Sequence, residues 1–199
     1  MTKPKRKTRL KKSQAIIFFL SLCFITGTIA GIFSALTMNE QNALRSIESI
    51  VNYINRINLG ETSPPIIIFV DSLIKHGTTA LLIWVLALIK FGGLIILPAF
   101  MLTGARYGFS TALLIKTFGF RGLIYAAFIY LPQAMILIPC YFLLSYCGIN
   151  FSLTSITKNG KFYSEIKNYA FKLLIALLLI MLVSGLDVLI LNFVEGRLM

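Results

Sequence analysis

The stretch AIIFFLSLCFITGTIAGIFSAL, residues 15–36, decides the fold of this chain. It carries no charged residue and is long enough to cross the hydrocarbon core of a bilayer, which takes about 20 apolar residues in a helix. A secretory signal has a shorter apolar core, of about 7–15 residues, followed by a cleavage site with small residues, and this stretch fits neither feature. It therefore predicts a first transmembrane helix that is retained.

A strongly basic segment precedes this helix. Residues 1–14 contain Lys and Arg side chains but no acid, and such segments accumulate on the cytoplasmic side of membrane helices. We therefore expect a cytoplasmic amino-terminal tail. Inside the helix small residues recur every four positions and could form a smooth face for another helix, although chance would also explain the pattern. They are Cys23, Gly27, Gly31 and Ala35.

The composition of the whole chain is that of a membrane protein. Of its 199 residues 57% are hydrophobic and 13% are charged, far from the balance of a soluble domain. The net charge of +12 comes from basic residues beside apolar runs, which argues against nucleic-acid binding. The cysteines lie inside apolar runs, where packing is a better explanation than metal ligation or disulfides. We expect an all-α, polytopic integral membrane protein without metal or cofactor.

Four further segments are apolar enough to enter the membrane. They are residues 79–102, 107–118, 123–146 and 173–194. Segment 107–118 is short for a span, so it is either a tilted or recessed helix or a re-entrant segment. Pro132 and Pro139 are expected to bend the segment that contains them. The sequence thus predicts about five transmembrane helices.

Residues 37–77 are expected to form an extracytoplasmic loop with an amphipathic helix. Gly60 is a plausible end of this helix, and Pro64-Pro65 would begin a second short helix. His76, the only histidine, would lie solvated at the membrane boundary. The apolar side chains of the amphipathic helix recur at helical spacing and form either a partner-binding face or a face that lies on the bilayer. They are Leu44, Ile47, Ile50, Val51, Ile54 and Ile57.

Basic residues also orient the carboxyl-terminal half. Residues 148–172 contain four lysines against one acid, which indicates a cytoplasmic loop. Five spans place this loop, the tail and Arg106 on the cytoplasmic side, and the carboxyl terminus outside. A re-entrant segment 107–118 would instead put the lysine-rich loop outside, against the positive-inside rule. Five spans are therefore favoured.

Two charged residues lie inside apolar runs, Lys90 and Asp187. An unpaired charge at the centre of a membrane helix costs at least about 2.5 kcal/mol, so we expect the two to approach each other. A structural ion pair is favoured over an ion pathway, since transport normally recruits polar groups from several spans. No catalytic motif can be assembled from this sequence.

The sequence resembles the stage II sporulation protein M family of five-span membrane proteins. The resemblance rests on features that occur in one order between Trp84 and Leu144 and continue into the last span. They are Trp84, Gly104-x-x-x-Gly108-Phe109, Gly119-Phe120-Arg121-Gly122, Leu131-Pro132-Gln133 and Ser184-Gly185-Leu186-Asp187. Gly104, Gly108, Pro132 and Gln133 are the family-motif positions, in a binding or a packing role.

The resemblance implies a non-enzymatic membrane scaffold for engulfment of the forespore during sporulation. In that family the protein acts with stage II sporulation proteins D and P, which remodel peptidoglycan. The implied location is the cell membrane, including the sporulation septum, and the implied partners are membrane lipids and these extracytoplasmic proteins. A small membrane transporter or transporter-associated subunit is the alternative.

The predicted topology can be tested by labelling a single cysteine. A cysteine placed at Asn159, in a variant whose native cysteines are replaced, is expected to be protected from a membrane-impermeant thiol reagent in intact protoplasts and to react after permeabilisation. Labelling in intact protoplasts would contradict five spans with a cytoplasmic amino terminus.

Overall fold

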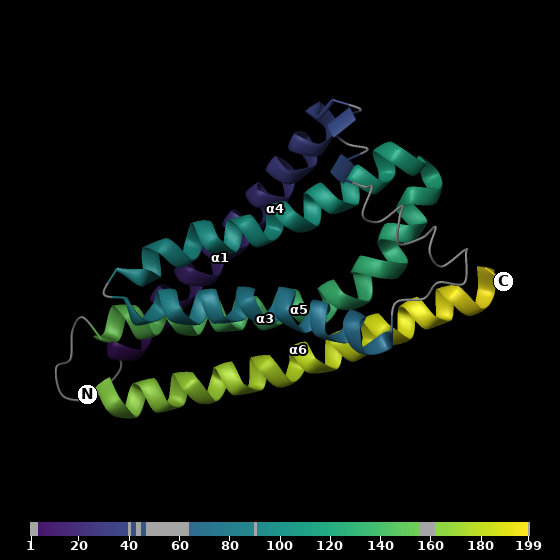
Figure 1. Cartoon of the computed structure of the whole chain (residues 1–199). Coiled ribbons are helices and arrows are strands. Elements are labelled where there is room, and N and C mark those ends of the chain that lie inside the picture. The colour runs from purple at the N-terminus through teal and green to yellow at the C-terminus, as the bar shows by residue number, and fades with distance from the viewer. Residues whose placement is uncertain are drawn as a thin grey trace.

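The chain forms a bundle of long helices. The computed structural model describes residues 4–39, 41–42, 45–46, 64–89, 91–155 and 162–198. The long helices are α1 (Pro4–Thr37), α3 (Pro65–Leu88), α4 (Gly92–Phe118), α5 (Phe120–Ser155) and α6 (Phe162–Leu198) (Figure 1). Each contains a segment long and apolar enough to cross a membrane. The expected all-α polytopic fold with five spans is therefore confirmed.

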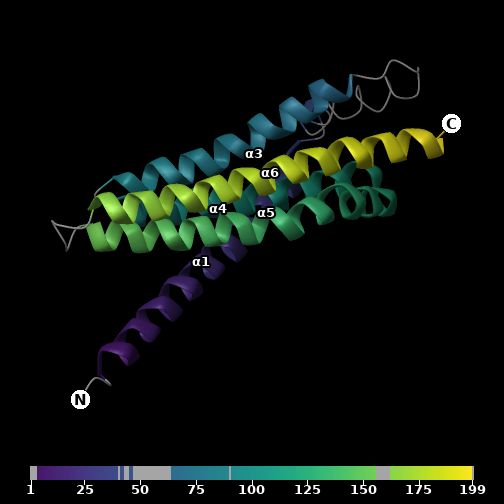
Figure 2. The same ribbon diagram turned by 90° about the horizontal axis from the view of Figure 1, so that it is seen from below.

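All five helices contribute to one apolar core. α3 and α6 lie along each other, whereas α1 leaves the bundle at a steep angle and packs mainly against α4 (Figures 1 and 2). Each helix buries at least one large apolar side chain completely in the common core; examples are Leu20, Ile83, Phe100, Leu137 and Ile180. The opposite sides of the helices expose apolar side chains, such as Phe18 (65% exposed) and Phe33 (68%). These sides face lipid in a membrane.

The boundaries of the second and third spans differ from the predicted ones. The predicted span 79–102 is divided, because α3 ends at Leu88 and α4 begins at Gly92. Gly92 is required there, since a Cβ at this position would overlap the carbonyl oxygen of Leu86. Segment 107–118 is neither a short span nor re-entrant: it is the second half of the 27-residue helix α4. Pro98 lies inside this helix and does not end it.

The second span also begins earlier than predicted. Pro64 precedes helix α3, as the Pro64-Pro65 pair suggested, but the helix that follows is a 24-residue candidate span rather than a short loop helix. Residues 65–77 are therefore continuous with the membrane helix. The predicted amphipathic stripe from Leu44 to Ile57 lies outside the described residues.

The connection between α4 and α5 is shorter than the four residues, 119–122, that separate the predicted segments. Gly119 alone separates the two helices and has a positive φ of 58°, a conformation that glycine adopts without a steric penalty. Pro132 and Pro139 both lie inside α5, which changes direction along its length (Figure 1). This bend agrees with the effect of proline on a helix.

Glycines bring α1 and α4 into backbone contact. A Cβ at Gly27 or Gly31 would overlap the carbonyl oxygens of Met101 and Ala105, respectively. Gly108 faces the backbone of Thr28 in the same way. Because the contacts advance in the same direction along both helices, α1 and α4 run parallel. The small-residue face predicted on α1 is a helix-packing face, with a matching face on α4.

A lysine fastens the far end of this helix pair. Lys116, in the last turn of α4, donates hydrogen bonds to the carbonyl oxygens of Ala35 (3.3 Å), Leu36 (3.0 Å) and Met38. These carbonyls lie at or beyond the end of α1, where helical carbonyls lack partners and a cation is favoured. The lysine therefore holds the end of α1 against α4.

The glycine contacts predict a stability difference between two alanine variants. Gly108→Ala is expected to lower the free energy of unfolding by about 1–3 kcal/mol, because the added methyl group overlaps the backbone of α1. Gly185→Ala is the control, because its Cβ would meet no atom within 4 Å and alanine favours helix. Equilibrium unfolding of the purified proteins in detergent would measure both. Equal stability of the two variants would contradict the packing.

Candidate functional site

Asp187 joins three helices inside the bundle. Its side chain on α6 is buried, at 7% exposure. Ser72 of α3 donates a hydrogen bond of 2.5 Å to one carboxylate oxygen, and Gln133 of α5 donates one of 2.6 Å to the other. Hydrogen bonds to a charged acceptor are stronger than neutral ones. Both oxygens therefore have a partner from a different helix.

Two cationic side chains, Lys75 and Arg106, line the same pocket as Gln133, the partner of Asp187. Lys75 follows Ser72 by about one turn on α3 and interacts electrostatically with Asp187. Arg106 of α4 donates a hydrogen bond of 3.4 Å to Thr79, one further turn along α3. Lys75 and Arg106 are both exposed. Because Thr79 follows Lys75 by four residues on α3, this hydrogen bond places Arg106 about one helical turn from Lys75 along the bundle.

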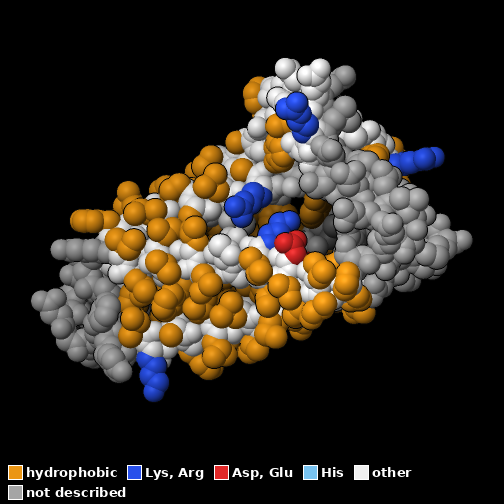
Figure 3. Space-filling view, in the orientation of Figure 1, with side chains coloured by type: hydrophobic (Ala, Val, Ile, Leu, Met, Phe, Trp, Pro, Cys, Tyr) orange, Lys and Arg blue, Asp and Glu red, His pale blue; other side chains and the backbone are white. Residues whose placement is uncertain are grey.

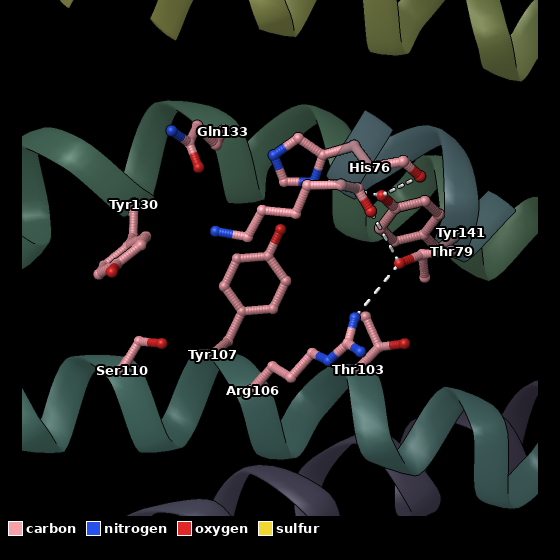
Figure 4. Close-up of a pocket in the computed structure, with 10 residues that line it drawn as sticks. His76, Thr79, Thr103, Arg106, Tyr107, Ser110, Tyr130, Gln133 and Tyr141 are labelled. Atoms are coloured by element: carbon pink, nitrogen blue, oxygen red, sulfur yellow. Dashed lines mark hydrogen bonds between the residues drawn. The ribbon is translucent and has the colours of Figure 1, made fainter. Parts of the chain in front are cut away.

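These residues surround a polar pocket of about 60 Å³ between α3, α4 and α5 (Figure 4). Tyr107 extends from α4 into this space, and Tyr130 and Gln133 reach it from α5 (Figure 4). The pocket is lined by hydroxyl, amide, imidazole and cationic groups. Its lining residues are Lys75, His76, Thr79, Thr103, Arg106, Tyr107, Ser110, Tyr130, Gln133 and Tyr141.

Two tyrosine hydroxyls at the pocket, those of Tyr141 and Tyr107, differ in their hydrogen bonding. The hydroxyl of Tyr141 donates a hydrogen bond of 3.0 Å to the carbonyl oxygen of His76 and lies 3.4 Å from its Nδ1 atom. The hydroxyl of Tyr107 is buried and has no hydrogen-bond partner among the residues that the structure describes. A buried polar group without a partner is uncommon in folded proteins. The Tyr107 hydroxyl is therefore available to a bound group in the pocket.

The pocket lies at membrane depth. At a rise of about 1.5 Å per residue, Lys75 is about 20 Å from the α3–α4 turn, and Arg106 is about 21 Å from it. The hydrocarbon core is about 30 Å thick, so both cations lie well inside the spanning segments. Figure 3 shows basic side chains and one acidic side chain beside a hollow, and many apolar side chains on the helices around it.

The structure describes some of the predicted site residues and not others. Asp187 is described, whereas Lys90 lies outside the described residues, so their pairing stays a prediction. Its premise changes, however, because position 90 falls between α3 and α4 in the sequence rather than in the middle of a span. The candidate partner-binding residues Leu44, Ile47, Ile50, Val51, Ile54 and Ile57 also lie outside the described part.

The family-motif positions take two places. Gly104 and Gly108 face α1, where a Cβ at Gly104 would meet the carbonyl oxygen of Phe24. Pro132 lies inside α5 beside Gln133, which binds Asp187 and lines the pocket. The glycines thus belong to helix packing, and Gln133 belongs to the polar site.

Sequence reasoning missed the basic part of the pocket. Arg106 was expected in a cytoplasmic loop and His76 at a solvated boundary, but both lie within candidate spans. His76 is half-buried. The available signal was Ile66-Ile67-Ile68 directly after the two prolines, which extends the apolar helix toward the amino terminus and places Lys75 and His76 inside it. Arg106 lies between Gly104 and Gly108, and this spacing indicates the interior of a packed helix.

The arrangement suits the binding of an anion. Two exposed cations, an unpartnered phenol and several hydroxyl groups can all interact with an anion. Within the described ranges no group of three His, Cys, Asp or Glu side chains could hold a metal ion.

Comparison with known proteins identifies the family. The model of the family described as stage II sporulation protein M matches residues 20–186. This range contains α3, α4 and α5 entirely, as well as most of the spanning parts of α1 and α6. No match was found among curated proteins or among solved structures. Because the family match covers most of the chain and confirms the resemblance seen in the sequence, this chain belongs to the stage II sporulation protein M family.

Proposed function

We propose that this protein is a non-enzymatic membrane scaffold that recruits peptidoglycan-remodelling proteins during engulfment of the forespore. The observation that carries the proposal is membership in the stage II sporulation protein M family, which associates this multi-pass membrane protein with sporulation. Candidate partners are stage II sporulation proteins D and P or equivalent extracytoplasmic proteins. In this role the protein would act at the sporulation septum, with its amino terminus in the cytoplasm and its carboxyl terminus outside.

The fold supports a scaffold in two respects. The five candidate spans provide a stable membrane anchor. Residues 38–64 separate α1 from α3 in the sequence, and they carry the apolar stripe predicted from the sequence. With the amino terminus inside, this connection is on the side where peptidoglycan enzymes work.

A transporter is the second candidate, and the polar pocket between the helices favours it. Substrate sites of transporters lie within the membrane among polar groups of several helices, and this pocket draws on α3, α4 and α5. Transport would require purified protein in liposomes to move a solute or protons, with a lower flux in Asp187→Asn. Normal engulfment in a deletion strain together with such a flux would establish the transporter instead of the scaffold.

Deletion of the gene tests the proposed process. In a spore-forming host, the deletion strain is expected to complete the septum and then stop before the mother-cell membrane surrounds the forespore, because the hydrolases would lack their membrane anchor. Fluorescence microscopy with a membrane dye measures this, and expression of the wild-type gene at a second site is the control. Normal engulfment in the deletion strain would refute the scaffold.

A double substitution tests the extracytoplasmic stripe as the partner-binding face. Ile50→Ser with Ile54→Ser is expected to abolish co-purification of the partner at an unchanged protein level, because both substitutions remove apolar groups without changing charge. Asn52→Ser, in the same segment but off the stripe, is the matched control. Loss of the protein itself would favour a structural role for the stripe, and unchanged partner recovery would exclude it from the interface.

A further inference from the structure

The cations of the polar pocket form no ion pair with the described residues. The ammonium group of Lys75 makes no hydrogen bond or ion pair within the described part of the chain, and the guanidinium of Arg106 bonds there only to the neutral hydroxyl of Thr79. The described acids nearby are Asp71, one turn before Lys75 on α3, and Asp187, whose two oxygens already accept hydrogen bonds from Ser72 and Gln133. An exposed cation inside a membrane span is costly without an anion. Because neither acid forms an ion pair with these cations in the described part of the chain, an anionic ligand would give them a partner.

The pocket has the size and groups for one small oxyanion. Its volume of about 60 Å³ has room for roughly four to six water molecules at 10–15 Å³ each. An arginine and a lysine can both bind phosphate. The unpartnered hydroxyl of Tyr107 adds a hydrogen-bond donor. A phosphate group would thus find charge and hydrogen bonding in the same small space.

An apolar groove adjoins the polar pocket. It has a volume of about 380 Å³ and lies between α1, α4 and α5. Tyr107 and Tyr130 line both cavities, so the two are neighbours. Away from the tyrosines the groove is lined by side chains such as Ile32, Leu123 and Ile138. Its volume is within the range of about 300–1,000 Å³ that small-molecule sites occupy.

We propose that this combined site binds an anionic phospholipid, with its phosphate between Lys75 and Arg106 and an acyl chain in the groove between α1, α4 and α5. A ligand with a charged end and an apolar end matches this site, because its charged end fits the polar pocket and its apolar end fits the adjoining groove. A lipid is also the ligand with direct access, because the site lies within the spanning segments. The bound phosphate offsets the charge of the two cations, and the acyl chain fills the space beside the tyrosines.

Lipid binding to the purified full-length protein tests this site. Native mass spectrometry of the protein in neutral detergent would compare phosphatidylglycerol with phosphatidylcholine that has the same acyl chains. The choline cation cancels the phosphate charge, so the wild-type protein is expected to prefer phosphatidylglycerol by about tenfold or more, as hydrogen bonds to a charged group allow. Absence of any preference overturns the proposal.

Charge variants locate the preference. Lys75→Gln with Arg106→Gln is expected to remove it, whereas Lys167→Gln with Lys172→Gln is expected to retain it. The control pair removes the same charge from exposed positions on α6. If the preference persists in the first pair, the pocket is not the site and the proposal fails.

A bulky residue in the groove tests the acyl chain separately. Ala134→Phe fills part of the groove and is expected to weaken binding of long-chain phosphatidylglycerol but not of a dihexanoyl form. Ala170→Phe, at an exposed position on α6, is the matched control. Equal binding of the long-chain lipid by both variants overturns the lipid assignment. The lipid assignment also fails if inorganic phosphate displaces the lipid and binds with the same affinity, because the site would then be one for a soluble oxyanion.

If the variant with both Lys75→Gln and Arg106→Gln does not fold, the lipid comparison with the wild-type protein and the Ala134→Phe experiment still decide the proposal. The result is also separate from the proposed scaffold function. A deletion strain can fail in engulfment whether or not the lipid site exists, and the lipid preference can be absent in a functional scaffold.

Discussion

The close approach of α1 and α4 is the constraint on which the arrangement of the polar site depends. Gly104 and Gly108 turn one face of α4 toward α1, and a side chain on that face would overlap the α1 backbone. Residues four apart share a helical face, and a residue two positions away projects from the opposite side. Arg106 must therefore point away from α1 and reach Thr79 on α3. The helical turn of α4 that packs against α1 thus also directs Arg106 toward α3.

Asp187 imposes a second constraint, which selects the faces that α3, α5 and α6 present to one another. A buried carboxylate without partners is costly, so a rotation of α3 or α5 that removes Ser72 or Gln133 is disfavoured. Ser72 and Lys75 are three residues apart and share one side of α3. Fixing Ser72 on Asp187 therefore also fixes the position of Lys75 at the pocket. Apolar packing alone would leave these rotations less well defined, since lipid-facing and buried side chains have similar chemistry.

The number of spans could be predicted because length and apolarity are local properties. Residues 15–36 show this directly, and the small-residue face of α1 was visible for a similar reason. The start of α3 was missed because Asp71, Lys75 and His76 make the segment look too polar for a span. In the folded chain Lys75 and His76 line the pocket, and Ser72, between them and Asp71, binds Asp187. Whether a polar residue has such a partner depends on helices that are distant in the sequence, so local composition could not reveal the site.

The parallel pairing of α1 and α4 also determines the order in which this protein can assemble. The chain must cross the membrane in the opposite direction, as α3, before α4 can lie beside α1 in the same direction. During synthesis the glycine face of α1 therefore contacts only lipid until α3 and α4 have been inserted. Helices that are each stable in lipid can associate after insertion through close packing of small residues. The first helix to enter the membrane is thus among those that cannot complete their contacts until later segments arrive, and Lys116 can secure the end of α1 only after α4 has been inserted in full.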